Sequence, residues 1–438
     1  MRIAVLGLGK VGVSLAEHFI ASGNEVIGID DKPEVRQLSE AAQQLKIKFY
    51  LAGAAPLLSE IDEVYISPGV SHDHPFAAQA RAQGVKLQGE LDLGAALTKA
   101  PIIAITGTNG KSTTTMLIGH ILEQAKLKVR MGGNLGTPFL DLVKNSSDVD
   151  WLVVEVSSFQ LELAQKFKPR ISVLLNITDD HYDRHAGIDA YTQAKAKVFS
   201  NQTAENYLIY NADDLQVLKA VKGAKATLVP FSSIRKVEGA YEDKGKLTFS
   251  YRGKQAAWDL SKVQLKGVHN LENMLAAVAA TSLAGIEPAC IQTALESFRG
   301  LPHRLEFVRK VGGVEFYDDS KGTNVGAVVM SLASFEQDVV LIAGGRDKGG
   351  DYSPLKALVK NKCRGVVVLG EAAPLIARAL EGYCQIERVK SMEEAVQKAN
   401  QLAKGCGYVL LSPACSSFDM YRDYHERGND FRRCVDRL

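Results

Sequence analysis

The sequence predicts an α/β protein that folds into three domains, each built on a mostly parallel sheet. The first observation is that apolar runs of strand length alternate with helix-length amphipathic runs along the whole chain. The second is that glycine-bearing turns follow apolar strands in each third of the chain. The third is the length, because 438 residues correspond to about three domains of ~150 residues. We expect domains at residues 1–91, 92–299 and 300–438.

The composition excludes several classes of protein. The net charge is only +2 and the basic residues are scattered, so neither nucleic acid nor a membrane surface is an expected partner. No apolar run has membrane-spanning length, and the chain begins directly with a strand rather than with a signal peptide. The six cysteines form no Cys-x-x-Cys pair, which favours a reducing compartment. We therefore expect a cytoplasmic protein without a membrane segment, and separately we expect a monomer.

The N-terminal domain begins with a strand at residues 2–6, followed by Gly7-x-Gly9-x-x-Gly12 and a helix. A second strand at 25–29 ends at Asp30, which is the outline of a Rossmann-like half. The segment is too short for a full dinucleotide fold, so we expect a ligand with one diphosphate and a ribose. Further strands are predicted at residues 63–66 and 85–87.

The central domain opens with the most informative motif of the chain. An apolar strand at residues 102–105 leads into Gly107-Thr-Asn-Gly-Lys111 and then into hydroxyl residues that start a helix. Backbone N–H groups of such a turn bind a phosphate, Lys111 adds positive charge, and Ser112 or Thr113 is placed to hold Mg²⁺. Ile105 stands where the usual pattern has a further glycine. The motif predicts a P-loop ATPase parallel sheet that binds ATP or GTP.

Chemically active side chains follow two later strands of the central domain. Glu155 lies at the carboxyl end of the strand at residues 151–156. A carboxylate there suits Mg²⁺, although a strand-end glutamate is otherwise simply solvated. His181 follows the strand at 171–176 among aspartates that suit a divalent ion. Lys195 lies on the next helix, and taken alone it is expected to be exposed. We also predict an antiparallel hairpin insertion within 237–260 and a helix at 270–283.

The C-terminal domain is predicted to be a second Rossmann-like sheet with loops that suit anions. Asp318-Asp-Ser-Lys-Gly-Thr-Asn324 and Gly344-Gly-Arg-Asp-Lys-Gly-Gly350 each follow a strand and present lysine or arginine beside glycine. Ser412-Pro-Ala-Cys-Ser-Ser-Phe418 offers further hydroxyl and backbone donors, and we interpret its cysteine as a packing residue. Strands are expected at residues 315–317, 339–343, 365–369 and 408–411, a helix at 392–402, and a tight turn at 311–314.

Together these motifs resemble the Mur ligase family of peptidoglycan synthesis. The resemblance spans all three predicted domains in the family's order, with Thr106-Gly-Thr-Asn-Gly-Lys-Ser-Thr113, Glu155-Val-Ser-Ser-Phe-Gln-Leu-Glu162, Asp180-His181, His269-Asn-x-x-Asn273, Leu301-Pro-His-Arg304 and Asp319-Ser-Lys-Gly-Thr-Asn324. The loops 344–350 and 412–419 are most similar to those of the branch that adds D-glutamate. No Asp-Asn-Pro-Arg motif of the diaminopimelate- or lysine-adding branch occurs, and Asn109 stands where the alanine-adding branch tends to have histidine.

The resemblance implies a ligase that forms an amide at the expense of ATP. The implied substrates are UDP-N-acetylmuramoyl-L-alanine, whose carboxylate would form an acyl phosphate with release of ADP, and D-glutamate, whose amine would displace the phosphate. The implied cofactors are ATP and two Mg²⁺ ions. Ser112 and Glu155 would hold one ion, and His181 would hold the other together with Lys195, converted by CO₂ to a carbamate.

The resemblance also assigns the remaining site residues. The catalytic residues would be Lys111, Glu155, His181 and Lys195. The ATP contacts would be Gly107, Thr108, Asn109, Gly110, Lys111, Ser112, Thr113, Asn273, Arg304 and Asp319. The UDP-substrate would contact Val11, Gly12, Asp30, Asp31, Lys32, Ser67, Gly69, Asn134 and Gln160, and D-glutamate would contact Lys321, Thr323, Lys348, Ser417, Phe418 and Tyr424.

Three positions depart from the family pattern. Asp31-Lys32 replaces an expected Thr-Arg pair at the uracil end, Phe418 replaces a leucine, and Tyr424 replaces a phenylalanine. The alternatives are a folylpolyglutamate synthase-like ligase, a P-loop switch module that drives a partner by hydrolysis, and a dehydrogenase. The N-terminal glycine-loop domain argues against the first, and the anion loops of the C-terminal domain would have no role in the second.

Overall fold

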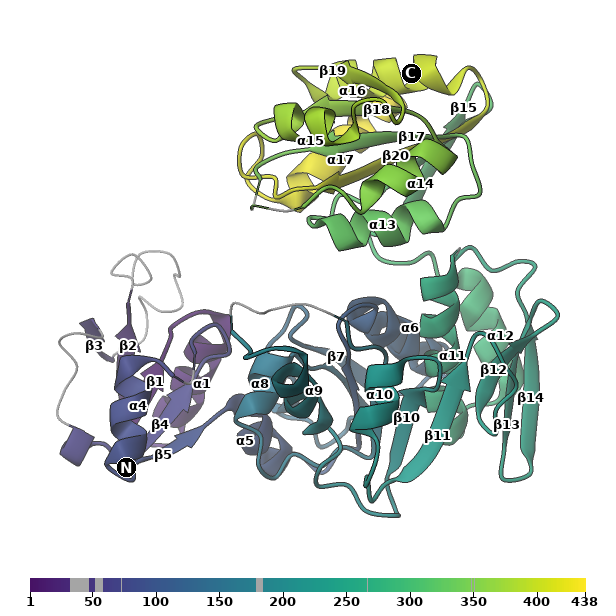
Figure 1. Ribbon diagram of the computed structural model, residues 1–438. Coiled ribbons are helices and arrows are strands. Elements are labelled where there is room, and N and C mark those ends of the chain that lie inside the picture. The colour runs from purple at the N-terminus through teal and green to yellow at the C-terminus, as the bar shows by residue number, and fades with distance from the viewer. Residues whose placement is uncertain are drawn as a thin grey trace. The chain divides into compact units, whose positions relative to one another are not determined.

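The structure is a computed structural model that describes the chain except for residues 32–46, 52–57, 72, 179–183, 266, 348 and 350. The chain forms two compact units (Figure 1). The first contains Met1–Val263 and Glu272–Phe298, and the second contains Gln264–Leu271 and Arg299–Leu438. No helix within the described ranges is both long and apolar enough to cross a membrane.

The N-terminal sheet is parallel and has the strand order β3-β2-β1-β4-β5. This is the order of a Rossmann half, as the sequence predicted. Alternate residues of β1 face opposite sides, so one face packs on α1 and the other on α4. The elements are β1 (Arg2–Leu6), α1 (Lys10–Ala21), β2 (Glu25–Asp30), β3 (Lys48–Leu51), the short 3-10 helix η2 (Leu58–Glu60), β4 (Glu63–Ile66), α4 (Pro75–Ala82) and β5 (Lys86–Gln88).

The central sheet has nine strands in the order β14-β13-β12-β11-β10-β9-β6-β8-β7. The run from β7 to β12 is parallel, and β13 and β14 add antiparallel strands at one edge. The predicted hairpin is therefore an extension of the central sheet. The strands are β6 (Ile102–Thr106), β7 (Val129–Gly133), β8 (Trp151–Glu155), β9 (Ile171–Leu174), β10 (Tyr207–Asn211), β11 (Thr227–Ser232), β12 (Ala240–Asp243), β13 (Lys246–Tyr251) and β14 (Lys254–Asp259).

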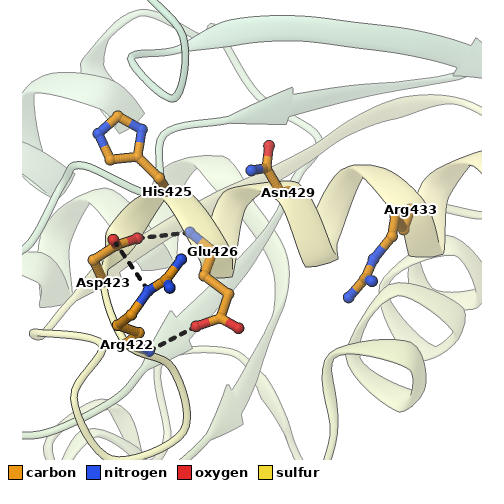
Figure 2. Close-up of a pocket in the computed structure, with 6 residues that line it drawn as sticks. All are labelled: Arg422, Asp423, His425, Glu426, Asn429 and Arg433. Carbon is orange, nitrogen blue, oxygen red and sulfur yellow. Dashed lines mark hydrogen bonds and ion pairs between the residues drawn. The ribbon is translucent and has the colours of Figure 1, made fainter.

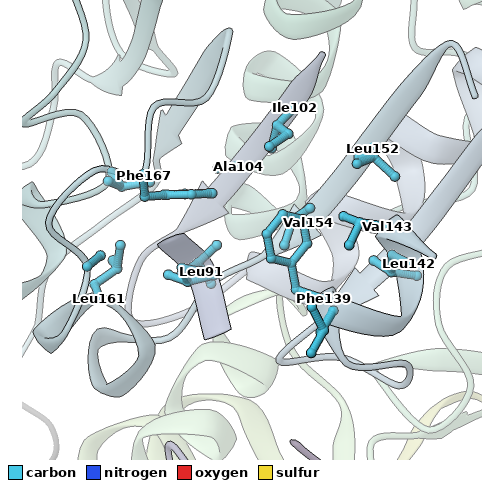
Figure 3. Close-up of a cluster of buried hydrophobic side chains, with 14 of the residues drawn as sticks. Leu91, Ile102, Ala104, Phe139, Leu142, Val143, Leu152, Val154, Leu161 and Phe167 are labelled. Atoms are coloured by element: carbon cyan, nitrogen blue, oxygen red, sulfur yellow. The ribbon is translucent and has the colours of Figure 1, made fainter. Parts of the chain in front are cut away.

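One hydrophobic core joins the N-terminal and central sheets. Side chains of β6 and β8 meet Phe139 and its neighbours on α7 (Figure 3). The same cluster contains Ile3 and Val5 of β1, which explains why both sheets belong to one compact unit. The helices of this part are α5 (Glu90–Leu97), α6 (Lys111–Gln124), α7 (Phe139–Val143), α8 (Ser158–Glu162), α9 (Ile188–Ala196), α10 (Leu215–Ala220), α11 (Val268–Leu283) and α12 (Pro288–Ser297).

The C-terminal sheet has the order β15-β16-β20-β17-β18-β19 and is parallel except for β15. One face packs on α13, α14 and α15, and the other on α16 and α17 (Figure 1). The predicted tight turn joins β15 to β16, with positive φ at both Gly312 and Gly313. The elements are β15 (Glu306–Val311), β16 (Val314–Asp318), α13 (Val325–Ala333), β17 (Val339–Gly344), α14 (Leu355–Lys362), β18 (Cys363–Leu369), α15 (Ala373–Leu380), β19 (Gln385–Arg388), α16 (Met392–Ala403), β20 (Gly407–Ala414) and α17 (Tyr424–Asp436).

Candidate functional site

The predicted phosphate loop joins β6 to α6, and its shape requires glycine. Gly110 lies immediately before α6 with φ of 83°, a left-handed conformation that side chains disfavour. A Cβ added there would lie 2.2 Å from Oδ1 of Asn273. The loop therefore turns tightly against α11 and leads into the N-terminus of α6, the arrangement that presents N–H groups to a phosphate.

Two lysine side chains converge on this loop. Nζ of Lys111 donates to the carbonyl oxygens of Gly107 at 2.9 Å and Thr108 at 2.8 Å. Nζ of Lys195, on α9, donates to the same Gly107 oxygen at 2.8 Å. Lys195 is only 1% exposed and its ammonium lies 4.4 Å from the centre of the Tyr191 ring. The expectation that this lysine is exposed, made from the helix alone, was wrong, because α9 packs its lysine against the phosphate loop.

Asn176, the second residue after β9, fixes the backbone of the loop. The N–H of Thr108 donates to the carbonyl oxygen of Asn176 at 2.9 Å, and the N–H of Asn109 donates to Oδ1 of Asn176 at 2.8 Å. Ser112 and Thr113 are buried at the start of α6. Asn176 was not predicted, since an asparagine after a strand is also a common turn residue.

Glu155 stands beside the loop because β8 is the neighbour of β6, with Glu155 opposite Ile105. Its Oε1 accepts a hydrogen bond from Nδ2 of Asn134 at 2.7 Å. Its Oε2 is buried and has no hydrogen-bond partner among the described residues. A carboxylate oxygen without a donor, in a side chain 3% exposed, is suited to a cation, so this residue fits the magnesium ligand that the sequence predicted.

Gln160 is held by contacts inside the protein. Its Oε1 accepts from the N–H of Ser157 at 2.9 Å, in the capping box that starts α8. Its Nε2 donates at 2.7 Å to Oε1 of Glu90, the first residue of α5. Burial raises the pKa of Glu90 above its ordinary value. The amide of Gln160 thus ties α8, just after Glu155, to the helix that follows the N-terminal sheet.

The glycine loop of the N-terminal sheet is also sterically determined. A Cβ on Gly12 would lie 1.8 Å from the carbonyl oxygen of Gly7. Oδ2 of Asp30 accepts from the N–H of Leu8 at 2.8 Å, and the N–H of Ser67 donates to Leu6 at 2.9 Å. The structure therefore brings Gly12, Asp30 and Ser67 together at the carboxyl ends of β1, β2 and β4.

The remaining predicted contacts of this loop are more peripheral. Asp31 is exposed and lies 3.1 Å from Nε2 of His74, Val11 is half-buried and Gly69 is exposed. Lys32 and His181 lie outside the described residues.

A buried arginine connects three loops of the C-terminal domain. Nη2 and Nε of Arg427, on α17, donate to the carbonyl oxygen of Ser320 at 2.8 Å and to its hydroxyl at 3.0 Å. Nη1 donates to the carbonyl oxygens of Cys415 at 3.2 Å and Gly344 at 3.5 Å. Burial lowers the pKa of Arg427 to about 10. All three loops that sequence analysis proposed as anion sites are therefore held by one side chain that it missed.

The predicted D-glutamate contacts lie on these loops, except for Tyr424, which begins α17. Nζ of Lys321 donates to the Tyr424 hydroxyl at 3.2 Å and lies 4.8 Å from the centre of that ring. Ser417 is buried, Thr323 is half-buried, and Phe418 is 62% exposed. Lys348 lies outside the described residues.

Asp319 is surrounded by donors of its own domain. Its Oδ2 accepts from the hydroxyls of Ser331 and Ser412, each at 2.7 Å, and the Arg304 guanidinium is close enough to stabilise its charge. Burial nevertheless outweighs these contacts and raises the pKa of Asp319 to about 6. Asp319 therefore organises the start of this domain, with two hydroxyls on Oδ2 and the N–H of Leu305 on Oδ1 at 3.3 Å.

Two charged clusters of the C-terminal domain hold their own counter-charges. His303, Glu306 and Asp318 form the one metal-like cluster in the described part of the chain, but Arg432 ion-pairs with both acids. A pocket beside α17 is likewise lined by both charge signs (Figure 2). There the N–H of Arg422 donates to Glu426 at 2.8 Å. The pocket residues are Arg422, Asp423, His425, Glu426, Asn429 and Arg433. We assign no ligand to either cluster.

Three protein-family models match successive parts of the chain, and all three describe domains of Mur ligases. Residues 1–89 match the model of the Mur ligase MurD-like N-terminal domain. Residues 105–281 match the Mur ligase middle domain, and residues 303–415 match the Mur ligase glutamate ligase domain. The predicted boundaries at 91 and 299 fall between these matches and stay predictions.

Curated relatives match over almost the whole length. A protein of Geotalea daltonii named UDP-N-acetylmuramoylalanine--D-glutamate ligase is 43% identical over 99% of this chain and 97% of its own. One of the same name from Syntrophotalea carbinolica is 43% identical over 100% of this chain and 98% of its own.

Solved structures show the same fold at low sequence identity. A pseudomurein peptide ligase type C from Methanothermus fervidus superposes with a TM-score of 0.61 at 18% identity, covering 100% of this chain and 99% of that one. The UDP-N-acetylmuramate-alanine ligase of Thermotoga maritima gives a TM-score of 0.58 at 20% identity, with the same coverage.

Proposed function

Because the chain belongs to the Mur ligase family, we propose that it joins D-glutamate to UDP-N-acetylmuramoyl-L-alanine in an ATP-dependent, ADP-forming step of peptidoglycan precursor synthesis. The observation that carries the proposal is the phosphate loop, which two lysine side chains contact, with Glu155 on the neighbouring strand. The D-glutamate branch is supported by relatives of that name over the full length.

The first step is attack by the alanyl carboxylate on the γ-phosphorus of ATP. An oxygen–phosphorus bond forms, the bond to the β-phosphate oxygen breaks, and ADP leaves with that electron pair. Two anions must approach each other in this step, so neutralisation and positioning supply most of the catalysis. Lys111 is assigned to this task because its ammonium reaches the loop that cradles the phosphates.

Magnesium, when bound, would neutralise further phosphate charge. Glu155 and Ser112 would hold one ion, and the buried Oε2 of Glu155 supports this assignment. His181 and Lys195 are assigned to a second ion, with Lys195 as its carbamate. The first assignment rests on a described carboxylate, and the second on the resemblance alone.

The second step is attack by the amine of D-glutamate on the acyl phosphate. The nitrogen–carbon bond forms through a tetrahedral intermediate, the carbon–oxygen bond breaks, and phosphate and a proton are released. Lys321 supplies positive charge for a carboxylate of D-glutamate, together with Lys348. Tyr424 orients Lys321, since its hydroxyl accepts from the ammonium at 3.2 Å.

The three substrates are assigned to separate loops. The glycine loop with Gly12, Asp30 and Ser67 takes the uridine diphosphate, and Asn134 and Gln160 lie on the sugar and peptide side. The phosphate loop takes ATP, with Asn273 against Gly110. Arg304 and Asp319 are assigned to ATP by the resemblance. We further propose that the enzyme acts as a monomer in the cytoplasm, and light scattering of the purified protein tests the monomer.

The test is phosphate release with ATP, Mg²⁺ and UDP-N-acetylmuramoyl-L-alanine against a panel of D- and L-amino acids. We expect turnover with D-glutamate and a product that is heavier than the UDP-substrate by one glutamyl residue. Turnover with another amino acid alone would reassign the branch. Release that needs no amino acid would favour the switch module, and turnover of a folate without the UDP-substrate would favour the folylpolyglutamate alternative.

A further inference from the structure

Arg184 connects the N-terminal and central parts of the first unit through one guanidinium. Its Nη1 donates to the carbonyl oxygen of Pro68 at 2.7 Å, and its Nη2 donates to Oε2 of Glu162 at 2.8 Å. The guanidinium carbon lies 4.1 Å from the centre of the Phe159 ring. The side chains of Arg184 and Glu162 are 12% and 9% exposed, so the contacts are made away from bulk water.

The two ends of this connection belong to different substrate regions. Pro68 lies between Ser67 and Gly69, and the N–H of Ser67 is itself bound to the end of β1 at 2.9 Å. Phe159 and Glu162 lie on α8, which begins three residues after Glu155. The guanidinium therefore fixes the loop proposed for the uridine diphosphate relative to the strand end proposed for catalysis.

A planar guanidinium is suited to this geometry, whereas an ammonium is not. Arginine offers donors in a rigid fork that can reach a carbonyl and a carboxylate together while its face lies on an aromatic ring. Lysine has a single nitrogen at the end of a flexible stem, so it can satisfy Glu162 only by giving up Pro68. Since Ser67 remains tied to β1, the loop itself would persist without the guanidinium, but its distance to α8 would no longer be fixed.

We propose that Arg184 is a positioning residue that aligns the diphosphate-binding loop with the catalytic strand end, so that one long substrate engages both. The inference rests on the proposed function, because it requires a UDP-substrate that spans the two regions. Arg184 acts through Pro68 and α8 and is not assigned to contact the reacting atoms. Loss of Arg184 should therefore weaken the binding of a ligand that occupies both regions and leave the binding of a ligand that occupies one region unchanged.

The experiment compares UDP with UDP-N-acetylmuramoyl-L-alanine as ligands for the full-length protein. Binding of each is measured by titration calorimetry without ATP, for wild type and for Arg184→Lys. We expect the Kd of UDP to stay within twofold of wild type and the Kd of the whole substrate to rise at least fivefold. The KM values for ATP and D-glutamate should stay within twofold.

The matched control is Arg364→Lys. Arg364 also joins a carboxylate to a backbone carbonyl, because its guanidinium donates to Asp338 at 2.8 Å and to the carbonyl oxygen of Ala403 at 2.7 Å. It lies at the start of β18, and the loops proposed for substrates follow the carboxyl ends of the strands. Neither Kd should change in this variant. If Arg184→Lys does not fold, Phe159→Leu leaves both hydrogen-bond acceptors in place and removes the ring that holds the guanidinium in its plane. It should weaken whole-substrate binding in the same direction and leave UDP unchanged.

Two results would overturn the proposal. An unchanged Kd for the whole substrate in a folded variant would show that alignment does not depend on Arg184. Equal weakening of UDP and of the whole substrate would show damage to the loop itself. Wild-type turnover with D-glutamate is measured first, so failure of the proposed function is recognised separately.

Discussion

Replacement of Glu155 by glutamine should stabilise the metal-free protein and remove its response to magnesium. Glu155 buries a carboxylate whose Oε2 has no hydrogen-bond partner in the described part of the chain. Glutamine keeps the acceptor for Asn134, which now donates to Oε1 at 2.7 Å, and removes the buried charge. An unpaired buried polar group costs about 1–3 kcal/mol, and more when it is charged.

The expected gain is smaller than that cost, because the new amide brings a donor of its own into the same place. We expect about 1 kcal/mol, which corresponds to a rise of about 2–4 °C in melting temperature for a domain of this size. A ligand at 100 times its Kd stabilises the folded state by about 2.7 kcal/mol. Wild type should gain roughly that amount from magnesium and a nonhydrolysable ATP analogue, and Glu155→Gln should gain much less.

The assay is thermal unfolding of both proteins, in EDTA and in magnesium with the nucleotide analogue. The order of the two melting temperatures should reverse between these conditions. Glu123→Gln is the control, because Glu123 is an exposed glutamate on α6 and should change neither value. A lower melting temperature in EDTA together with a full magnesium response would refute the reasoning, since Oε2 would then be a satisfied structural acceptor.

Three further substitutions test other parts of the site. Gly110→Ala should cost about 1–2 kcal/mol of backbone strain and raise the KM for ATP at least tenfold, because the new Cβ meets Asn273. The control is Gly23→Ala, since Gly23 has a similar φ and open space around it. This variant should leave the KM for ATP unchanged. Burial raises the pKa of Glu272 to about 7, so its charge destabilises the folded state at high pH. Glu272→Gln should therefore raise the free energy of unfolding by an amount that depends on pH. The pH-dependent gain should be absent below about pH 4.5 and should approach about 3 kcal/mol above pH 7. An equal effect in thermal unfolding at pH 5 and pH 8 would contradict this sign. Glu90→Leu should lower the free energy of unfolding by about 1–3 kcal/mol, because the buried amide of Gln160 loses its acceptor. Glu90→Gln keeps an acceptor and should lower it by less. Equal melting temperatures for the two variants would argue against a stabilising role of that hydrogen bond.

Most strands that the sequence predicted are buried and apolar, but the partly buried β10 and β11 were also missed. β1, β4 and β13 have the bounds expected from the sequence. Their side chains alternate between the two faces of a sheet, and this alternation can be recognised in the sequence. β3 and β19 were missed, since they are short edge strands with mixed polarity and gain their structure from one neighbour only. β7 was missed because it ends in Gly132 and Gly133, which propensity disfavours in strands. A Cβ on Gly132 would lie 2.4 Å from Thr137, so tertiary packing selects that glycine.

The parts of the site that could be predicted are those where one short segment carries the chemistry. The phosphate loop places Gly110 and Lys111 within a few residues, and strand order then brings Glu155 beside them. Arg427 could not be predicted, because its partner Ser320 lies 107 residues away and no local pattern marks a buried arginine. Arg184 was passed over for a similar reason, since its contact with Pro68 spans 116 residues.

Lys195 shows how the proposed chemistry constrains the unmodified protein. As an ammonium it donates to the Gly107 carbonyl oxygen, which Lys111 also contacts, so two like charges share one acceptor. Such proximity is unfavourable unless an anion is bound nearby. A carbamate is an anion, and its oxygens would be repelled by the carbonyl oxygen that the ammonium now contacts. Modification of Lys195 therefore requires its head group to leave Gly107, and Lys111 remains to hold that oxygen at 2.9 Å. The shared acceptor would thus allow the phosphate loop to keep its shape if Lys195 changes, as proposed, from donor to metal ligand.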